Sequence, residues 1–214
     1  MPVASLILAA GGGSGHCYAP KPLLGFKATV SKVKFNVTES ARSLTGLHGP
    51  KGGGVVTGLA FSPLYYEYQM HYSVTEQGNK ICVAVDKMHI NFRARPFVFV
   101  SKEFPRGSCE FNAVLNHENK HVSTLKKVQR KYAQDFKKYV YDTILQVKPV
   151  KISSPGQLAA AQKKIEKQVN ARLESYIEEI GYDLAREQTK VDSPSEYERV
   201  HNLCENWASR LRLD

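Results

Sequence analysis

The amino-acid sequence predicts an α+β fold, with an antiparallel sheet in the first half of the chain and helices in the second. Apolar residues alternate with polar ones between residues 28 and 104, and they recur at helical spacing from Ser108 onward. A chain of 214 residues with 42% hydrophobic content can also bury a substantial core. We therefore expect a single domain over residues 20–214, β-rich at 28–104 and helical at 108–214.

The expected strands are runs in which every second residue is apolar. These runs are 33–37, 66–74, 81–85 and 88–92. Such alternation is typical of antiparallel strands with one buried face. Residues 75–80, TEQGNK, predict a hairpin turn, whereas the glycine-rich residues 48–58 fit either a hairpin or a lid.

A long amphipathic helix is predicted from Ser108. On a helical wheel at about 100° per residue, its apolar side chains fall within about 80° of His117, and His121 lies on the same stripe. The apolar members are Val114, Leu125, Val128, Tyr132 and Tyr139. Both histidines are therefore expected to be buried.

Two further helices are predicted after a connector at 147–155. Ser154-Pro155 is typical of a helix start, and the capping-box pattern at 193–196 predicts the start of the last helix. We expect the last helix to bury Tyr197, Val200, Cys204, Trp207 and Leu211.

The chain is strongly basic, with 30 Lys and Arg against 20 Asp and Glu and a net charge of +10. This balance favours contact with anionic partners. The basic residues of the first long helix lie mainly opposite its apolar stripe, and no nucleic-acid recognition module accompanies them. We interpret them as a solvated helix face, expect no nucleic-acid partner, and regard acidic cell-envelope polymers as compatible with the charge.

The first 19 residues contain an apolar run at 3–10 followed by small residues, which resembles a secretory signal or, through GGGSG, a linker. The run is too short to span a bilayer. Four cysteines without a C-x-x-C pair fit one or two disulfides, and we hypothesise that Cys82 pairs with Cys109. These features predict a secreted or periplasmic protein without a transmembrane segment.

The letters H-E-N-K-H place His117, Glu118 and His121 at a spacing with chemical meaning. Histidines at i and i+4 lie one above the other on a helix, so both imidazoles can reach one Zn²⁺ ion. Glu118 is rotated by about 100° from His117, which places its carboxylate beside the metal. There it can take a proton from zinc-activated water and pass it to a leaving amine.

This H-E-x-x-H helix beside a sheet resembles the zincin metallopeptidases. The strands, the stretch GSCEFNAVLNHENKHV and the long helices are most similar to bacterial predicted secreted zinc-dependent proteases grouped as a domain of unknown function. The motif-level resemblance covers residues 81–125. It implies hydrolysis of peptide or protein substrates, with His117 and His121 as ligands and Glu118 as general base. Thr124 and Lys127 stand where a metzincin needs Gly and His, which excludes that class.

The third zinc ligand is expected from Glu196, because it faces the buried stripe of the last helix and a buried carboxylate needs a partner. Glu196 also fits the capping box, and His201 is the next candidate. Carboxylates that point inward on the preceding helix stay open as alternatives: Glu166, Asp183 and Glu187. Four other residues are excluded because they lie on the outer face or too far along the helix: Glu174, Glu178, Asp135 and Cys109.

Two other functions remain open at this point. The chain fits a non-catalytic, envelope-associated zinc-binding module, or a nucleic-acid-binding protein that uses the basic helix face. Tyr197 fits either a donor to a tetrahedral oxyanion or a core aromatic residue.

Overall fold

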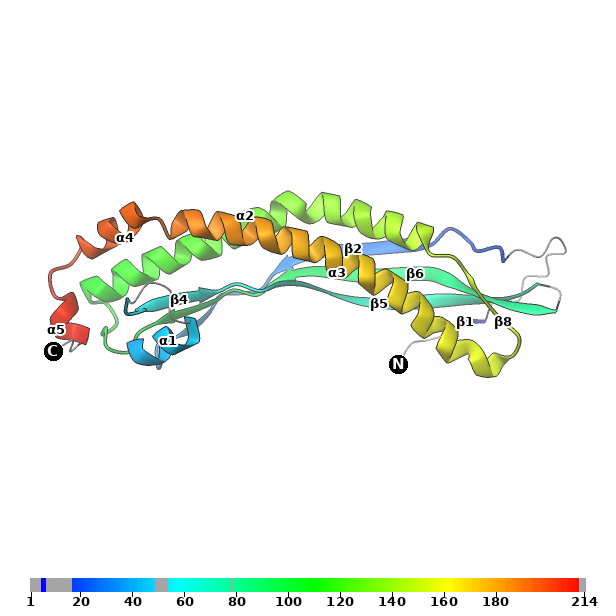
Figure 1. Cartoon of the computed structure of the whole chain (residues 1–214), viewed down its shortest axis with the longest axis horizontal. Coiled ribbons are helices and arrows are strands. Elements are labelled where there is room, and N and C mark those ends of the chain that lie inside the picture. Colours follow the sequence, from blue (N-terminus) through cyan, green and yellow to red (C-terminus); the bar gives the residue numbers. More distant parts are fainter. Residues whose placement is uncertain (1–4, 7–16, 49–53, 78, 212–214) are drawn as a thin grey trace. The chain divides into compact units, whose positions relative to one another are not determined.

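The computed structural model describes residues 5–6, 17–48, 54–77 and 79–211, and it confirms the α+β class. The strands are β1 (Ser5–Leu6), β2 (Leu23–Val30), β3 (Lys34–Asn36), β4 (Gly58–Phe61), β5 (Leu64–Gln77), β6 (Lys80–Ala94), β7 (Phe97–Val100) and β8 (Val150–Ile152). The helices are α1 (Ala41–His48), α2 (Cys109–Gln146), a 3₁₀ turn (Pro155–Gln157), α3 (Leu158–Val191), α4 (Pro194–His201) and α5 (Trp207–Leu211). Figure 1 shows α2 and α3 as the two long helices.

The chain forms two compact units. Unit 1 takes the described parts of residues 1–29, 65–92 and 132–179, and unit 2 takes those of residues 30–64, 93–131 and 180–214. Helices α2 and α3 each contribute to both units, because the division falls within them.

Unit 1 is built on a sheet with the strand order β1-β5-β6-β2, to which β8 adds by pairing with β6. Tyr68 and Tyr72 of β5 donate hydroxyl hydrogen bonds to α3, and an aromatic cluster forms around the fully buried Phe136 of α2. The ring of Phe92 lies 4.9 Å from that of Phe136, and Tyr176 of α3 stacks on it at 5.7 Å. These contacts join strand and helix into one core.

Unit 2 contains a smaller sheet with the order β3-β7-β4, in which β3 is parallel and β4 antiparallel to β7. Val98 and Val100 of β7 pack with Val114 and Val122 of α2, which makes the core of this unit. The register pairs Gly58 with Val100, so β4 begins beside the α2 segment that carries the H-E-x-x-H motif.

Several expectations about local structure need correction. The Cys82–Cys109 pairing is wrong, because the disulfides are Cys17–Cys82 in unit 1 and Cys109–Cys204 in unit 2. Helix α1 was not expected, since an eight-residue helix gives little periodicity. Residues 49–53 of the glycine-rich segment and Gly78 of the expected hairpin turn lie outside the described residues.

The last predicted helix is two short helices, α4 and α5, and neither contains a buried residue. Its start is confirmed, because the side chain of Ser193 accepts a hydrogen bond from the backbone N–H of Glu196. Tyr197 is 54% exposed, so its expected burial is wrong.

Two disulfides are typical of proteins that fold in an oxidising compartment. Among the described residues, no helix is long and apolar enough to cross a membrane.

Candidate metal centre

Helix α2 presents His117, Glu118 and His121 to the interior of unit 2. Their relative exposures are 7%, 5% and 8%, although polar residues are rarely buried without partners. The helical spacing brings the two imidazoles together with ring centroids 5.0 Å apart. The expected burial of both histidines on one stripe is therefore confirmed.

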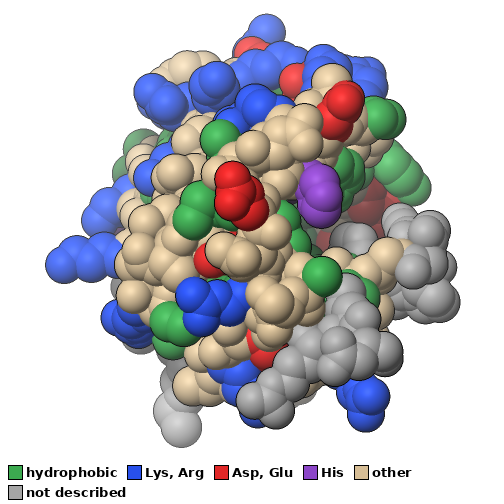
Figure 2. Space-filling model, turned by 90° about the vertical axis from the view of Figure 1, so that its left-hand side faces the viewer, with side chains coloured by type: hydrophobic (Ala, Val, Ile, Leu, Met, Phe, Trp, Pro, Cys, Tyr) green, Lys and Arg blue, Asp and Glu red, His purple; other side chains and the backbone are tan. Residues whose placement is uncertain are grey.

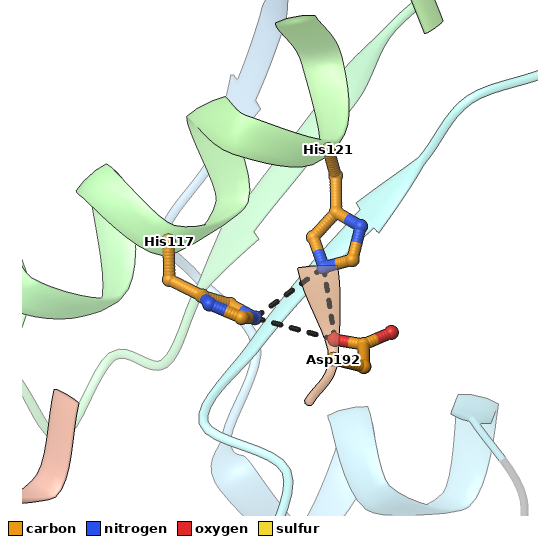
Figure 3. A group of neighbouring side chains, drawn as sticks. All are labelled: His117, His121 and Asp192. Carbon is orange, nitrogen blue, oxygen red and sulfur yellow. Dashed lines mark hydrogen bonds and ion pairs between the residues drawn. The ribbon is translucent and has the colours of Figure 1, made fainter. Parts of the chain in front are cut away.

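Asp192, at the end of α3, completes a three-residue group with the two histidines (Figure 3). Its Oδ1 atom lies 3.0 Å from Nε2 of His121 and 3.4 Å from Nε2 of His117. The two Nε2 atoms are 3.3 Å apart. Three potential ligand atoms thus converge on one point between α2 and the end of α3.

These separations match the spacing that a tetrahedral zinc ion imposes. Ligand bonds of about 2.0–2.1 Å at tetrahedral angles put neighbouring ligand atoms about 3.3–3.4 Å apart. The three measured distances of 3.0, 3.3 and 3.4 Å lie close to that value. The residues present therefore fit a divalent metal ion with three protein ligands.

Each imidazole has an acceptor oxygen beside its outer nitrogen, which favours the neutral tautomer whose inner nitrogen keeps a lone pair for a cation. Nδ1 of His121 lies 2.5 Å from Oε1 of Gln188, whose amide also donates to the His121 carbonyl at 3.1 Å. Nδ1 of His117 lies 3.4 Å from Oε1 of Glu196. With Nδ1 protonated in each ring, three acceptor atoms face one another, an arrangement that requires a metal ion or a proton between them.

The charges of the group reflect this convergence. Burial disfavours the charged form of His117 and His121, but hydrogen bonds to Asp192 and to the outer acceptors, together with the charge of Glu118, outweigh it and raise both histidine pKa values. Burial also disfavours charge on Asp192, yet its hydrogen bonds to the two histidines hold the pKa of this carboxyl well below its usual range. Asp192 is therefore ionised, as a metal ligand must be.

Glu196, expected as the third ligand, lies at the outer side of His117 instead of among the three converging atoms. Its carboxylate accepts hydrogen bonds from Arg199 at 2.7 Å and from Lys120 at 2.6 Å. The hydrogen bond from Arg199, followed by that from Lys120, holds the pKa of Glu196 far below its usual range. Glu196 thus has cationic partners of its own and supports the ring of His117.

The other candidate residues are not brought to this group. His201 is exposed, and its ring stacks near Trp207. Glu166 lies in unit 1, where its carboxylate accepts a hydrogen bond from the hydroxyl of Tyr72. Asp183 and Glu187 form ion pairs with basic residues of unit 2.

Asp192 was missed because it follows the last residue of α3, at Val191, and precedes the next N-cap. A helical wheel carried on from Leu184 places it about 80° away, at the edge of the same stripe. This position on the wheel is the sequence signal that pointed to Asp192.

Glu118 is held in a buried position between α2 and β4. Burial raises the pKa of its carboxyl to about 7, although the neighbouring histidines and a hydrogen bond from the backbone N–H of Ala60 oppose the shift. A Cβ atom added to Gly58 would overlap Val114 and lie 2.5 Å from Oε1 of Glu118. Glycine at position 58 is therefore what allows the strand to approach the carboxylate so closely.

Tyr197 of α4 closes the other side of the group. Its hydroxyl donates to Oδ1 of Asp192 at 3.0 Å, and its ring lies 5.6 Å from that of His117. Burial of the hydroxyl, together with the charge of Asp192, raises its pKa to about 12, so Tyr197 is a neutral hydrogen-bond donor.

A groove of about 790 Å³ opens onto these residues within unit 2. One wall is the segment from Gly54 to Pro63, which includes β4, and the opposite wall is formed by α3 and α4. The side chains of Val114, His117, Glu118 and His121 come from α2. The groove thus gives a ligand access to the three converging atoms and to Glu118.

Comparisons with family models, with curated proteins and with solved structures found no match for this chain. The site is consequently defined by its own geometry: two histidines and an aspartate that can hold a metal ion, beside a buried glutamate.

Proposed function

We propose that the protein is a zinc-dependent peptidase in which His117, His121 and Asp192 bind the metal and Glu118 is the general base. The observation that carries the proposal is the convergence of the three ligand atoms within 3.4 Å of one another next to the buried Glu118. Two histidines, one carboxylate and a neighbouring glutamate are the parts of a zincin-type hydrolytic site.

When bound, zinc supplies a Lewis acid that lowers the pKa of water toward 7 and polarises a carbonyl oxygen. Glu118 receives a proton from the attacking water at its carboxylate and returns it to the leaving amine. Its raised pKa suits both the uptake and the return of the proton, because a general base works best when its pKa lies near the operating pH. The hydroxyl of Tyr197 donates its one proton to Asp192, and it would stabilise the oxyanion at the attacked carbonyl by turning that proton from Asp192 to the substrate.

Gln188 and Glu196 support the ligands from outside. Each places an oxygen on the Nδ1 atom of one histidine, which orients the ring and raises the basicity of its inner nitrogen. Gln188 is anchored in turn by the carbonyl of His121, and Glu196 by Lys120 and Arg199. These contacts favour a site that is already organised before the metal binds.

We also propose a secreted or periplasmic location, which the two disulfides and the signal-like start support. Lys and Arg side chains lie along the top and left margins of the face shown in Figure 2. Together with the net charge of +10, they are suited to contact with acidic polymers of a cell envelope.

The test combines metal analysis with one substitution. Purified protein should hold one zinc ion per chain, and the zinc-loaded protein should cut members of a broad peptide panel. Glu118→Gln should keep the zinc but lower kcat by about 10²- to 10⁴-fold, because it removes the base and no ligand. Absence of zinc would refute the proposal, and zinc with no hydrolysis would favour the non-catalytic zinc-binding module.

A further inference from the structure

The α3 wall of the groove has a composition that the metal centre does not explain. Four residues of this helix line the groove at spacings that place them on one face: Gly181, Leu184, Ala185 and Gln188. Asp192, which also lines the groove, follows just after the helix ends. Gln188 and Asp192 contact the histidines, so the remaining part of the face extends the groove away from the metal.

This part of the wall leaves room for a side chain. A Cβ atom added at Gly181 meets no heavy atom within 4 Å, and Ala185, one turn further along, presents only a methyl group. The groove is therefore open along this part of α3, where larger side chains would narrow it.

The chemistry of this space is apolar. Apart from His117, Glu118, His121 and Asp192, the residues that line the groove carry no ionisable charge at neutral pH. Val114, Leu184 and Val200 face it from three helices, and Phe61 at its border is 57% exposed. Exposed apolar side chains around an apolar groove favour an apolar ligand.

Strand β4 indicates an extended ligand. Thr57 accepts a backbone hydrogen bond from Ser101, on the β7 side, so the alternate residues Gly58 and Ala60 direct their backbone groups away from β7. The N–H of Ala60 does so, since it donates to Glu118. Because the N–H of Ala60 is already bonded to Glu118, pairing with an extended peptide would use the other outward backbone groups of this edge, which are those of Gly58 and the carbonyl of Ala60.

We propose, on the basis of the peptidase function proposed above, that the wall formed by Gly181 and Ala185 selects substrates with a bulky apolar side chain at a distance from the cleaved bond. Ala185 lies about 10 Å and Gly181 about 16 Å along the helix axis from Asp192. An extended peptide advances about 3.3 Å per residue. The selected side chain is therefore about three to five residues from the bond that is cut, and acidic or basic side chains are disfavoured there.

The first arm of the test maps cleavage sites. The zinc-loaded wild-type protein is incubated with a library of extended peptides, and the products are identified by mass spectrometry. We expect enrichment of Leu, Ile, Met and Phe at one position in the stated interval. Cleavage without any such enrichment would overturn the inference and leave the peptidase function intact, whereas no cleavage at all would remove the peptidase function.

The second arm measures binding and needs no turnover. Zinc-loaded Glu118→Gln is titrated with fluorescent peptides that carry Leu or Ser at the selected position. Burial of a leucine side chain predicts about 10- to 100-fold tighter binding of the Leu peptide. In the double variant that also carries Ala185→Phe, the ratio of the Leu-peptide affinity to the Ser-peptide affinity should fall by at least about 10-fold, because the new ring fills the space.

The control is Ala171→Phe, which puts the same ring on an exposed position of α3 in unit 1. It should leave the preference unchanged, and neither substitution should alter zinc content. An equal Leu preference in Ala185→Phe and Ala171→Phe would overturn the inference. Gly181→Ala adds one methyl group to open space, so its preference for the Leu peptide should lie between those of the wild-type protein and of Ala185→Phe.

Discussion

The two units of this protein use the same two long helices for different purposes. In unit 1, α2 and α3 meet through the aromatic cluster around Phe136, whereas in unit 2 they supply two histidines and an aspartate. Each unit also pairs a tyrosine with a carboxylate. Tyr72 is 1% exposed and binds Glu166 in the unit 1 core, but Tyr197 is 54% exposed and binds Asp192 beside the groove.

The difference shows which surroundings turn a polar contact into a site. The Tyr72–Glu166 contact satisfies a buried hydroxyl, and a structural role explains it fully. Asp192 gives the same acceptor oxygen to Tyr197 and to both histidines, so three potential ligand atoms converge on one point. Such a convergence next to an open groove favours a metal ion, and matched substitutions in the two units test this contrast.

The largest expected effect is on zinc binding. Asp192→Asn replaces a ligand carboxylate with an amide and should lower zinc affinity by more than about 100-fold, measured by competition with a chromophoric chelator. Glu166→Gln makes the same chemical change in unit 1 and should leave the affinity unaltered. Equal affinities for the two variants would contradict the difference between the units.

Glu196→Gln refines the same comparison inside unit 2. Because Glu196 orients His117 from outside and does not bind the metal, this substitution should lower zinc affinity by only about 10-fold. If Glu196→Gln were more damaging than Asp192→Asn, the role of third ligand would return to Glu196.

A pair of glycines gives the next largest effect. Gly58→Ala forces a methyl group against Glu118 and Val114 and should lower kcat by about 10- to 100-fold with zinc retained, because small displacements of a catalytic group are costly. In unit 1, the atoms nearest to a methyl group at Gly25→Ala belong to the exposed ring of His89, which can turn away. Steady-state kinetics should therefore separate the two variants, and unchanged turnover in Gly58→Ala would refute the positioning of Glu118 by β4.

The two tyrosines should separate stability from activity. Tyr72→Phe removes a buried hydrogen bond and should lower the free energy of unfolding by about 1–2 kcal/mol in urea denaturation, with kcat unchanged. Tyr197→Phe should lower kcat by about 10-fold and leave the urea midpoint near that of the wild type. The opposite assignment of the two effects would show that Tyr197 is structural.

The smallest effect concerns a structural carboxylate of unit 2. Burial opposes ionisation of Glu103, but hydrogen bonds from Ser101 and from the N–H of Ala41 outweigh it and lower the pKa of the carboxyl from 4.5. The folded pKa lies below the unfolded one, so this stabilisation is present above about pH 4.5 and is lost as the pH falls through the folded pKa. The stability difference between wild type and Glu103→Gln should shrink when urea denaturation is repeated at about pH 3.5, and a constant difference would contradict the assignment.

Much of this structure could be predicted from the sequence, because its main signals are periodic. The alternation in β5 and β6 and the helical stripe through His117 and His121 are set by local geometry, and the structure confirms both. The start of α4 at Ser193 was also predictable, since capping is a contact between near neighbours.

The rest depended on contacts between distant segments. The third member of the site comes from a turn 71 residues after His121, and its place at the edge of the α3 stripe is too weak a local signal to prefer Asp192 over Glu196. The disulfide pairing likewise depends on chain paths, since Cys109 meets Cys204 over a separation of 95 residues. The contact of Gly58 with Glu118 joins a strand to a helix, and only the folded chain reveals it.

The most direct test of the central claim is a crystal structure of the zinc-loaded protein with anomalous diffraction recorded at the zinc edge. We expect one anomalous peak within about 2.0–2.2 Å of Nε2 of His117, Nε2 of His121 and a carboxylate oxygen of Asp192. Glu118 should lie beside the metal without binding it. A peak bound by other residues, or no peak at this site, would contradict the assignment of these three ligands.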